Sequence, residues 1–134
     1  MAFDIFLQAF RDGGAAEADV EVILSVVGSC IRRRDEWCTR IETSDGGADI
    51  YGLDTSVQSL MINHASGTAV WDLIYDLAQS AGLAVMPVGC PTCVTDNHAL
   101  SDLPPELASS AIIVSSADEL LLVVGGVDRE QRSV

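Results

Sequence analysis

Basic residues are nearly absent from this chain. It has no lysine, and none of its seven arginines lies in the stretch from Ile41 to Asp128. The chain has 20 Asp and Glu residues, so its formal net charge is −13. A surface of this sign repels nucleic acid phosphates and anionic membranes, so we expect neither as a partner. It would instead attract a basic protein.

Other absences further narrow the class of protein to which this chain can belong. No apolar run approaches the roughly 18 residues that suggest a membrane-spanning helix. The opening MAFDIFLQAF lacks the basic start and the cleavage site of a secretory signal, so we expect a cytoplasmic protein. In that compartment the four cysteines are thiols or metal ligands rather than a disulfide framework. No pair of glycines has the spacing and the lysine that a phosphate-binding loop requires.

Length and composition indicate one globular domain. A chain of 134 residues with 49% hydrophobic residues is long enough to bury a core and is too apolar to remain disordered. We expect the domain to cover residues 1–127, and residues 128–134 to form a polar C-terminal tail.

The centre of the chain, Val57 to Cys93, predicts a strand, a helix and a strand. Leu60–Ile62 is a short apolar run that ends before the turn residues Ser66 and Gly67, and Ser66 is a candidate N-cap. Gly82 then stands where a helix usually ends, and a strand follows over 83–88. The apolar residues between the caps recur at three- and four-residue spacing, which predicts a buried helix face: Val70, Leu73, Ile74, Leu77 and Ala81.

The rest of the chain supplies further strands and two helices. Strands are expected over 3–10, 38–43, 48–51 and 112–114. One helix begins near Glu17 and ends at Arg32–Arg34, where positive charge favours the helix dipole. Another begins at Ser116 with a capping box and is stopped by Gly125–Gly126.

This order, βαβββαβ followed by βα, predicts an α+β fold. Its sheet should be mixed and mostly antiparallel, with the helices on one face. The first part can be drawn as an elaborated ferredoxin-like split βαβ unit.

The only close cysteine pair, Cys90-Pro91-Thr92-Cys93, has three interpretations. It is half of a zinc site, a redox pair, or a tight turn with two small thiols. A zinc site needs two more ligands. The chain offers four candidates for them: Cys30, Cys38, His64 and His98. A Cys–His hydrolase would need a nucleophilic cysteine within hydrogen-bond reach of its histidine. The sequence does not place Cys90 or Cys93 near His64, so we expect no enzyme.

The predicted central helix also carries a candidate partner-binding surface. Trp71 and Tyr75 are four residues apart and form a stripe beside the apolar face. Asp72 and Asp76, one turn apart, fall on the exposed side. Aromatic side chains anchor interfaces and acidic ones steer association, so we interpret these four residues as a binding site for a basic protein.

A resemblance points in the same direction. The segments FDIFLQAFRDG, SGTAVWDLIYDLA and VGCPTC resemble small, acidic, uncharacterised proteins of high-GC, actinobacterial type. Such proteins are similar to the immunity proteins of polymorphic toxin systems, so the resemblance implies a partner that is a toxin domain. The leading hypothesis is therefore a non-enzymatic, cytoplasmic binding protein without a cofactor. The alternatives are a zinc-binding or thiol-redox protein built on Cys90 and Cys93, and a homodimerisation module.

Overall fold

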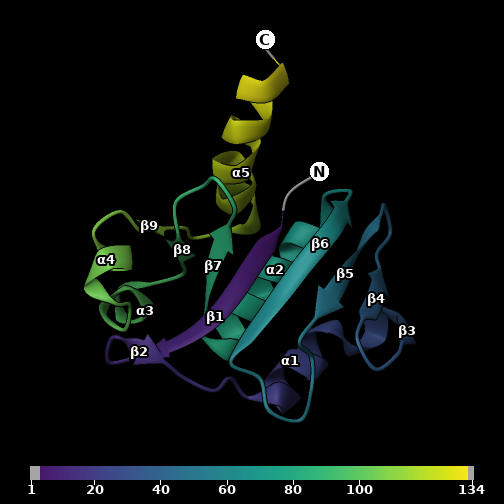
Figure 1. Cartoon of the computed structure of the whole chain (residues 1–134). Coiled ribbons are helices and arrows are strands. Elements are labelled where there is room, and N and C mark those ends of the chain that lie inside the picture. Colours follow the sequence, from purple (N-terminus) through teal and green to yellow (C-terminus); the bar gives the residue numbers. More distant parts are fainter. Residues whose placement is uncertain (1–3, 133–134) are drawn as a thin grey trace.

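The structure is an α+β fold, as predicted. The computed structural model describes the backbone of residues 4–132 and the side chains of residues 4–125 (Figure 1). Its strands are β1 (Ile5–Arg11), β2 (Gly14–Ala15), β3 (Ile31–Arg34), β4 (Thr39–Glu42), β5 (Gly47–Tyr51), β6 (Ser59–Ser66), β7 (Leu83–Pro87), β8 (Cys93–Val94) and β9 (Ile112–Ile113). Its helices are α1 (Val20–Val27), α2 (Ala69–Ala81), α3 (Asn97–Ser101), α4 (Pro105–Ala108) and α5 (Ala117–Arg132).

The strands form one mixed sheet in the order β3-β4-β5-β6-β1-β7-β8-β9, with β2 paired to β1. Every pairing is antiparallel except that of β8 with β9. β1 therefore lies between β6 and β7, which flank α2 in the sequence. The mostly antiparallel sheet is confirmed, and the ferredoxin-like arrangement stays a prediction.

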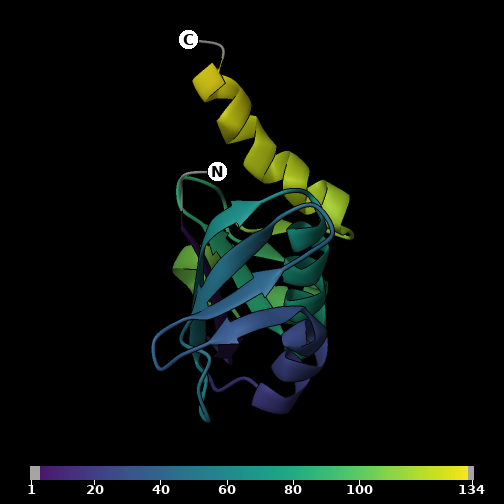
Figure 2. The same cartoon turned by 90° about the vertical axis from the view of Figure 1, so that its right-hand side faces the viewer.

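The main core lies between the sheet and α1, α2 and α5. Alternate residues of β1 show how the two faces differ: Ile5, Leu7 and Ala9 are buried, whereas Phe6 is 41% exposed. Because successive strand residues point to opposite faces, the buried set faces the helices. Figure 2 shows α1 and α2 together on one side of the sheet. The first turns of α5 add Leu120 and Val124 to this core.

A second, smaller core lies on the opposite face, so the prediction that all helices share one face is wrong for α3 and α4. Ala84 pairs with Gln8 and therefore points away from α2. It packs with Val94 and Leu103, and Phe10 joins them. This corner of the sheet carries small and aromatic side chains, which the α3–α4 segment covers and shields from water.

α2 has the length that its pattern predicts, but its N-terminal cap comes from elsewhere. Ser66 lies in β6, and Thr68 makes no side-chain cap of its own. Instead the Asp45 carboxylate, in the β4–β5 turn, accepts hydrogen bonds from Thr68 N (2.8 Å), Thr68 Oγ1 (3.0 Å) and Ala69 N (3.2 Å). These donors hold the pKa of Asp45 below its usual value. At the other end, Gly82 adopts the left-handed conformation, as predicted.

The arginine triplet is not at a helix end. α1 ends at Val27, a 3-10 turn follows over Gly28–Cys30, and Arg32–Arg34 lie in β3 at the edge of the sheet. Arg32 pairs with Glu42 of the neighbouring strand, with Nε and Oε2 3.4 Å apart. Charged side chains on an edge strand disfavour further strand pairing, which gives the triplet a structural role.

α5 begins where the capping box predicts and then runs further. Ser116 Oγ accepts from Glu119 N (3.1 Å), and the Glu119 carboxylate accepts from the backbone N–H and hydroxyl of Ser115. The expected stop at Gly125–Gly126 is wrong, because the helix continues to Arg132. A glycine inside a helix costs only about 1 kcal/mol relative to alanine. Residues 133–134 of the predicted tail lie outside the described part of the chain. None of the described helices is long and apolar enough to span a membrane.

Candidate functional site

The predicted partner-binding residues do not share one exposed surface. Trp71 is only 1% exposed and belongs to the main core, so its proposed role as an exposed anchor is wrong. Tyr75 is half-buried against the same core, while Asp72 and Asp76 are exposed. The exposed tryptophan is Trp37, 76% accessible in the turn between β3 and β4.

α1 adds an apolar surface beside these acidic residues. All of its residues except Glu21 and Ser25 are apolar, and a helix of this kind is usually buried on every side. Here only Ile23 and Val27 are fully buried. Four further apolar side chains are only partly covered: Val20, Val22, Leu24 and Val26.

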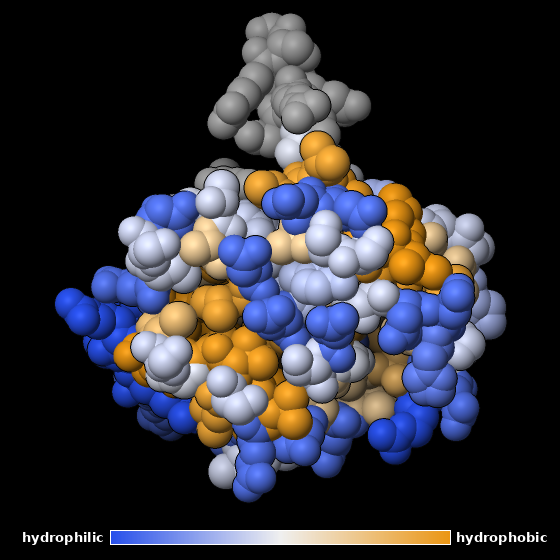
Figure 3. All heavy atoms as spheres, turned by 180° about the vertical axis from the view of Figure 1, so that it is seen from behind, coloured by the Kyte–Doolittle hydropathy of each residue, from blue (hydrophilic) through white to orange (hydrophobic). Residues whose placement is uncertain are grey.

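α1 and α2 pack side by side and form what we call the α1–α2 face: Val22, Leu24, Val26, Asp72 and Asp76. Figure 3 shows hydrophobic side chains gathered over α1, with hydrophilic ones running over α2 beside them. Among the described side chains, neither Asp72 nor Asp76 forms an ion pair. An apolar area bordered by uncompensated acids is typical of a protein-binding surface.

The cysteine pair is not arranged for metal binding or redox chemistry. Cys93 lies in β8 with no exposed surface, and Cys90 is half-buried in the turn before it. No three His, Cys, Asp or Glu side chains within the described part of the chain are grouped as metal ligands. The structure thus does not join the pair to any of the four candidate ligands: Cys30, Cys38, His64 and His98.

The thiol pKa values of the pair are shifted in the direction opposite to that of reactive cysteines. Burial raises the pKa of Cys90, and burial together with the nearby Cys90 raises the pKa of Cys93 to about 11. A redox-active pair needs a lowered thiol pKa, commonly at a helix N-terminus, whereas Cys93 begins a strand. The tight-turn interpretation agrees best with this geometry.

His64 faces a carboxylate and not a thiol. Its Nδ1 is 2.8 Å from Asp49 Oδ2, and Asp49 Oδ1 is 3.4 Å from Arg40 Nη1. The backbone of His64 has a positive φ of 53°, within a stretch where the β5–β6 register shifts. No nucleophilic side chain is hydrogen-bonded to the ring among the described contacts, so the arrangement does not supply a Cys–His dyad.

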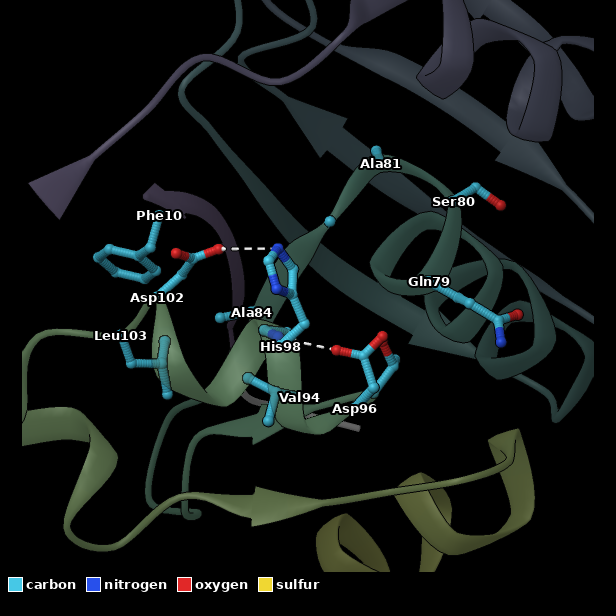
Figure 4. A pocket seen from close by; sticks show the side chains of 13 residues that line it. Phe10, Gln79, Ser80, Ala81, Ala84, Val94, Asp96, His98, Asp102 and Leu103 are labelled. Carbon is cyan, nitrogen blue, oxygen red and sulfur yellow. Dashed lines mark hydrogen bonds and ion pairs between the residues drawn. The ribbon is translucent and has the colours of Figure 1, made fainter. Parts of the chain in front are cut away.

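A cavity of about 340 Å³ opens between the C-terminal end of α2 and α3 (Figure 4). We call it the α2–α3 cavity. Its apolar lining comes from the second core and, at Ala81, from the edge of the main core. Its polar lining comes from α2 and from residues at and near α3. The apolar members are Phe10, Ala81, Ala84, Val94, Ala99 and Leu103, and the polar side chains are Gln79, Ser80, Thr95, Asp96, His98 and Asp102.

Two carboxylates define the polar side of this cavity. Asp96 caps α3 by accepting from Ala99 N at 2.7 Å. Asp102 Oδ1 accepts from Asp12 N at 3.2 Å, and its Oδ2 lies 3.7 Å from His98 Nε2. The C-terminal end of α3 is thereby held against the turn between β1 and β2, and both carboxylates line the cavity.

Sequence patterns do not reveal this cavity, because its walls come from β1, α2, β7, β8 and α3 and from the loops on either side of α3. Asp96, Asn97 and Asp102 are typical of a loop or a short helix, and only the cap at Asp96 gives a local signal. His98 enters the sequence argument only as a zinc ligand, whereas the structure places it next to Asp102.

No protein-family model, curated protein or solved structure is similar to this chain. The resemblance to immunity proteins therefore remains a hypothesis.

Proposed function

We propose that this chain is a non-enzymatic, cytoplasmic binding protein that holds a basic protein partner against the α1–α2 face, as an immunity-type inhibitor holds its toxin. One observation carries the proposal. α1 is apolar around nearly its whole circumference, yet only Ile23 and Val27 are fully buried, and Val22 and Leu24 are partly exposed and are not packed on the main core. Its remaining apolar surface lies next to acidic side chains with no internal counterion.

Charge decides the kind of partner. Residues 41–128 contain no lysine or arginine, so a permanent positive charge that neutralises the carboxylates of α2 must come from outside this segment. A second copy of the chain would place like charges against each other across a symmetric contact, and such contacts cost affinity. A basic partner with an apolar centre satisfies both parts of the face.

The test compares two changes on the face with one matched change elsewhere. A partner captured from the source organism is purified, and its association with the wild-type protein is measured at low and high salt. Asp76→Arg should slow association, because a rim charge acts mainly on the encounter rate. Leu24→Ser should instead speed dissociation, since Leu24 is half-buried and is not among the side chains packed on the main core.

Glu106→Arg is the control. Glu106 is exposed on α4, so this variant changes the net charge by the same amount as Asp76→Arg but leaves the face intact. It should weaken binding less than Asp76→Arg does. The proposal is wrong if the captured partner is acidic, if association does not depend on salt, or if both face variants bind like the wild type.

A further inference from the structure

We propose that the α2–α3 cavity is a second, separate site, which binds a small organic cation: an ammonium or guanidinium group on an apolar stem or ring. This inference does not rest on the α1–α2 face. The cavity lies at the C-terminal end of α2, against the second core, and none of the residues that define the face lines it.

The size and the apolar lining suit an organic group and not a bare ion. A volume of about 340 Å³ is within the range of small-molecule sites, and the lining is divided about evenly between apolar and polar groups. Phe10, Ala84 and Leu103 supply the apolar walls (Figure 4). They belong to β1, β7 and the loop after α3, so the walls are attached to the sheet and preformed.

The electrostatics of the cavity favour a positive charge. The last carbonyls of a helix have no intrahelical partner and carry a partial negative charge. α2 has no basic residue in its last turn to offset that charge, and Gln79–Gly82 border the cavity. Asp96 and Asp102 add two carboxylates. An anionic ligand would meet repulsion from both sources.

Both carboxylates keep acceptor capacity for a ligand. Asp96 uses one oxygen to cap α3, and no contact of its other oxygen appears among the described residues. Asp102 Oδ2 is 3.7 Å from His98 Nε2, which is longer than a normal hydrogen bond. Because an ionised carboxylate can accept about four hydrogen bonds, an ammonium or guanidinium donor can bind without displacing the existing contacts. Metal ions fit less well, since no three ligand side chains are grouped there among the described residues.

The experiment is an NMR titration of the full chain with benzylamine, with benzyl alcohol as the neutral probe of similar shape. Benzylamine should shift the backbone amide signals of residues around the cavity, such as Ala84 and Ala99, in a saturable way. Benzyl alcohol should bind several-fold more weakly. A third probe, N-acetyl-lysine methylamide, carries its ammonium group on a lysine side chain. Comparing it with benzylamine shows whether the cavity prefers a free amine or a side chain of a basic polypeptide. The proposal covers the cationic group that both sources share.

Asparagine substitutions remove each charge while keeping the structural hydrogen bond. Asn caps helices about as well as Asp, so Asp96→Asn should fold normally, and in Asp102→Asn the amide oxygen can still accept from Asp12 N. Each should weaken benzylamine binding about fivefold, the upper range for a partly exposed ion pair. Asp76→Asn makes the same change in net charge outside the cavity and should leave binding unchanged. Ala99→Leu, which partly fills the cavity, should weaken both aromatic probes.

The proposal is overturned if benzyl alcohol binds as tightly as benzylamine, or if the two cavity variants bind like Asp76→Asn. It is also overturned if the shifts fail to saturate or spread evenly over the acidic surface, because that pattern would mean a diffuse attraction to the net charge.

Discussion

Leu77→Ala tests the packing of α2 on the sheet, on which the whole fold depends. Leu77 is 1% exposed in the main core. Removing three buried carbons costs about 2.4 kcal/mol in transfer free energy, at about 0.8 kcal/mol each. The cavity left behind raises the expected loss of unfolding free energy to between about 2.5 and 5 kcal/mol. At roughly 4 °C per kcal/mol for a chain of this length, the melting temperature should fall by about 10 °C or more.

Leu122→Ala is the matched control. Leu122 is also a helical leucine but is 62% exposed on α5, so helix propensity changes equally in both variants and only burial differs. Its unfolding free energy should change by no more than about 0.5 kcal/mol. Urea unfolding followed by circular dichroism gives both values, and the dependence on denaturant should stay the same if both variants unfold in one step. A loss below about 1 kcal/mol for Leu77→Ala, or equal losses for the two variants, would refute the assigned helix face.

Three further predictions concern individual side chains. Hydrogen bonds from backbone N–H groups at the start of α2 lower the pKa of Asp45 below 3.8, so its capping contribution is complete above that pH and is lost as the pH falls through the folded-state pKa. The stability difference between wild type and Asp45→Asn should therefore shrink in acid unfolding below about pH 3.8, and a constant difference would contradict the cap. Cys93, with no exposed surface and a pKa raised to about 11, should react with iodoacetamide at pH 8 far more slowly than Cys30, as read by mass spectrometry. In Trp37→Phe, the remaining Trp71 should emit at short wavelength and resist acrylamide quenching, whereas a red-shifted, readily quenched emission would show that it is exposed.

The local patterns of the sequence determined the class of fold and the best-defined helix. The spacing of Val70, Ile74 and Leu77 identified the buried side of α2, and Gly82 identified its end. These signals are reliable because they act within one helical turn: a periodic apolar face and a residue that tolerates a positive φ need no knowledge of the rest of the chain.

The local signals and the structure disagree in three places. The helix expected to reach Arg34 ends at Val27, and Arg32–Arg34 pair with β4 instead. α5 passes through Gly125, where a stop was expected. Propensities and caps are worth about 1 kcal/mol each, so the pairing of a strand or the packing of a helix can exceed them. Trp71 is buried because α2 lies between α1 and α5 over the sheet, and a helical wheel alone cannot show how wide the covered side is.

The candidate sites depend on the tertiary structure even more strongly. Asp45 caps a helix that begins 24 residues later. The α2–α3 cavity combines Phe10, Ala84 and Asp102, which are up to 92 positions apart in the chain, since 102 − 10 = 92. The sequence by itself determined the net charge on which the proposal of a cationic partner rests, because charge is a sum over residues and needs no coordinates. Where such a partner binds depends on which carboxylates lack an internal counterion and which apolar side chains remain uncovered, and both are set only when distant elements pack together.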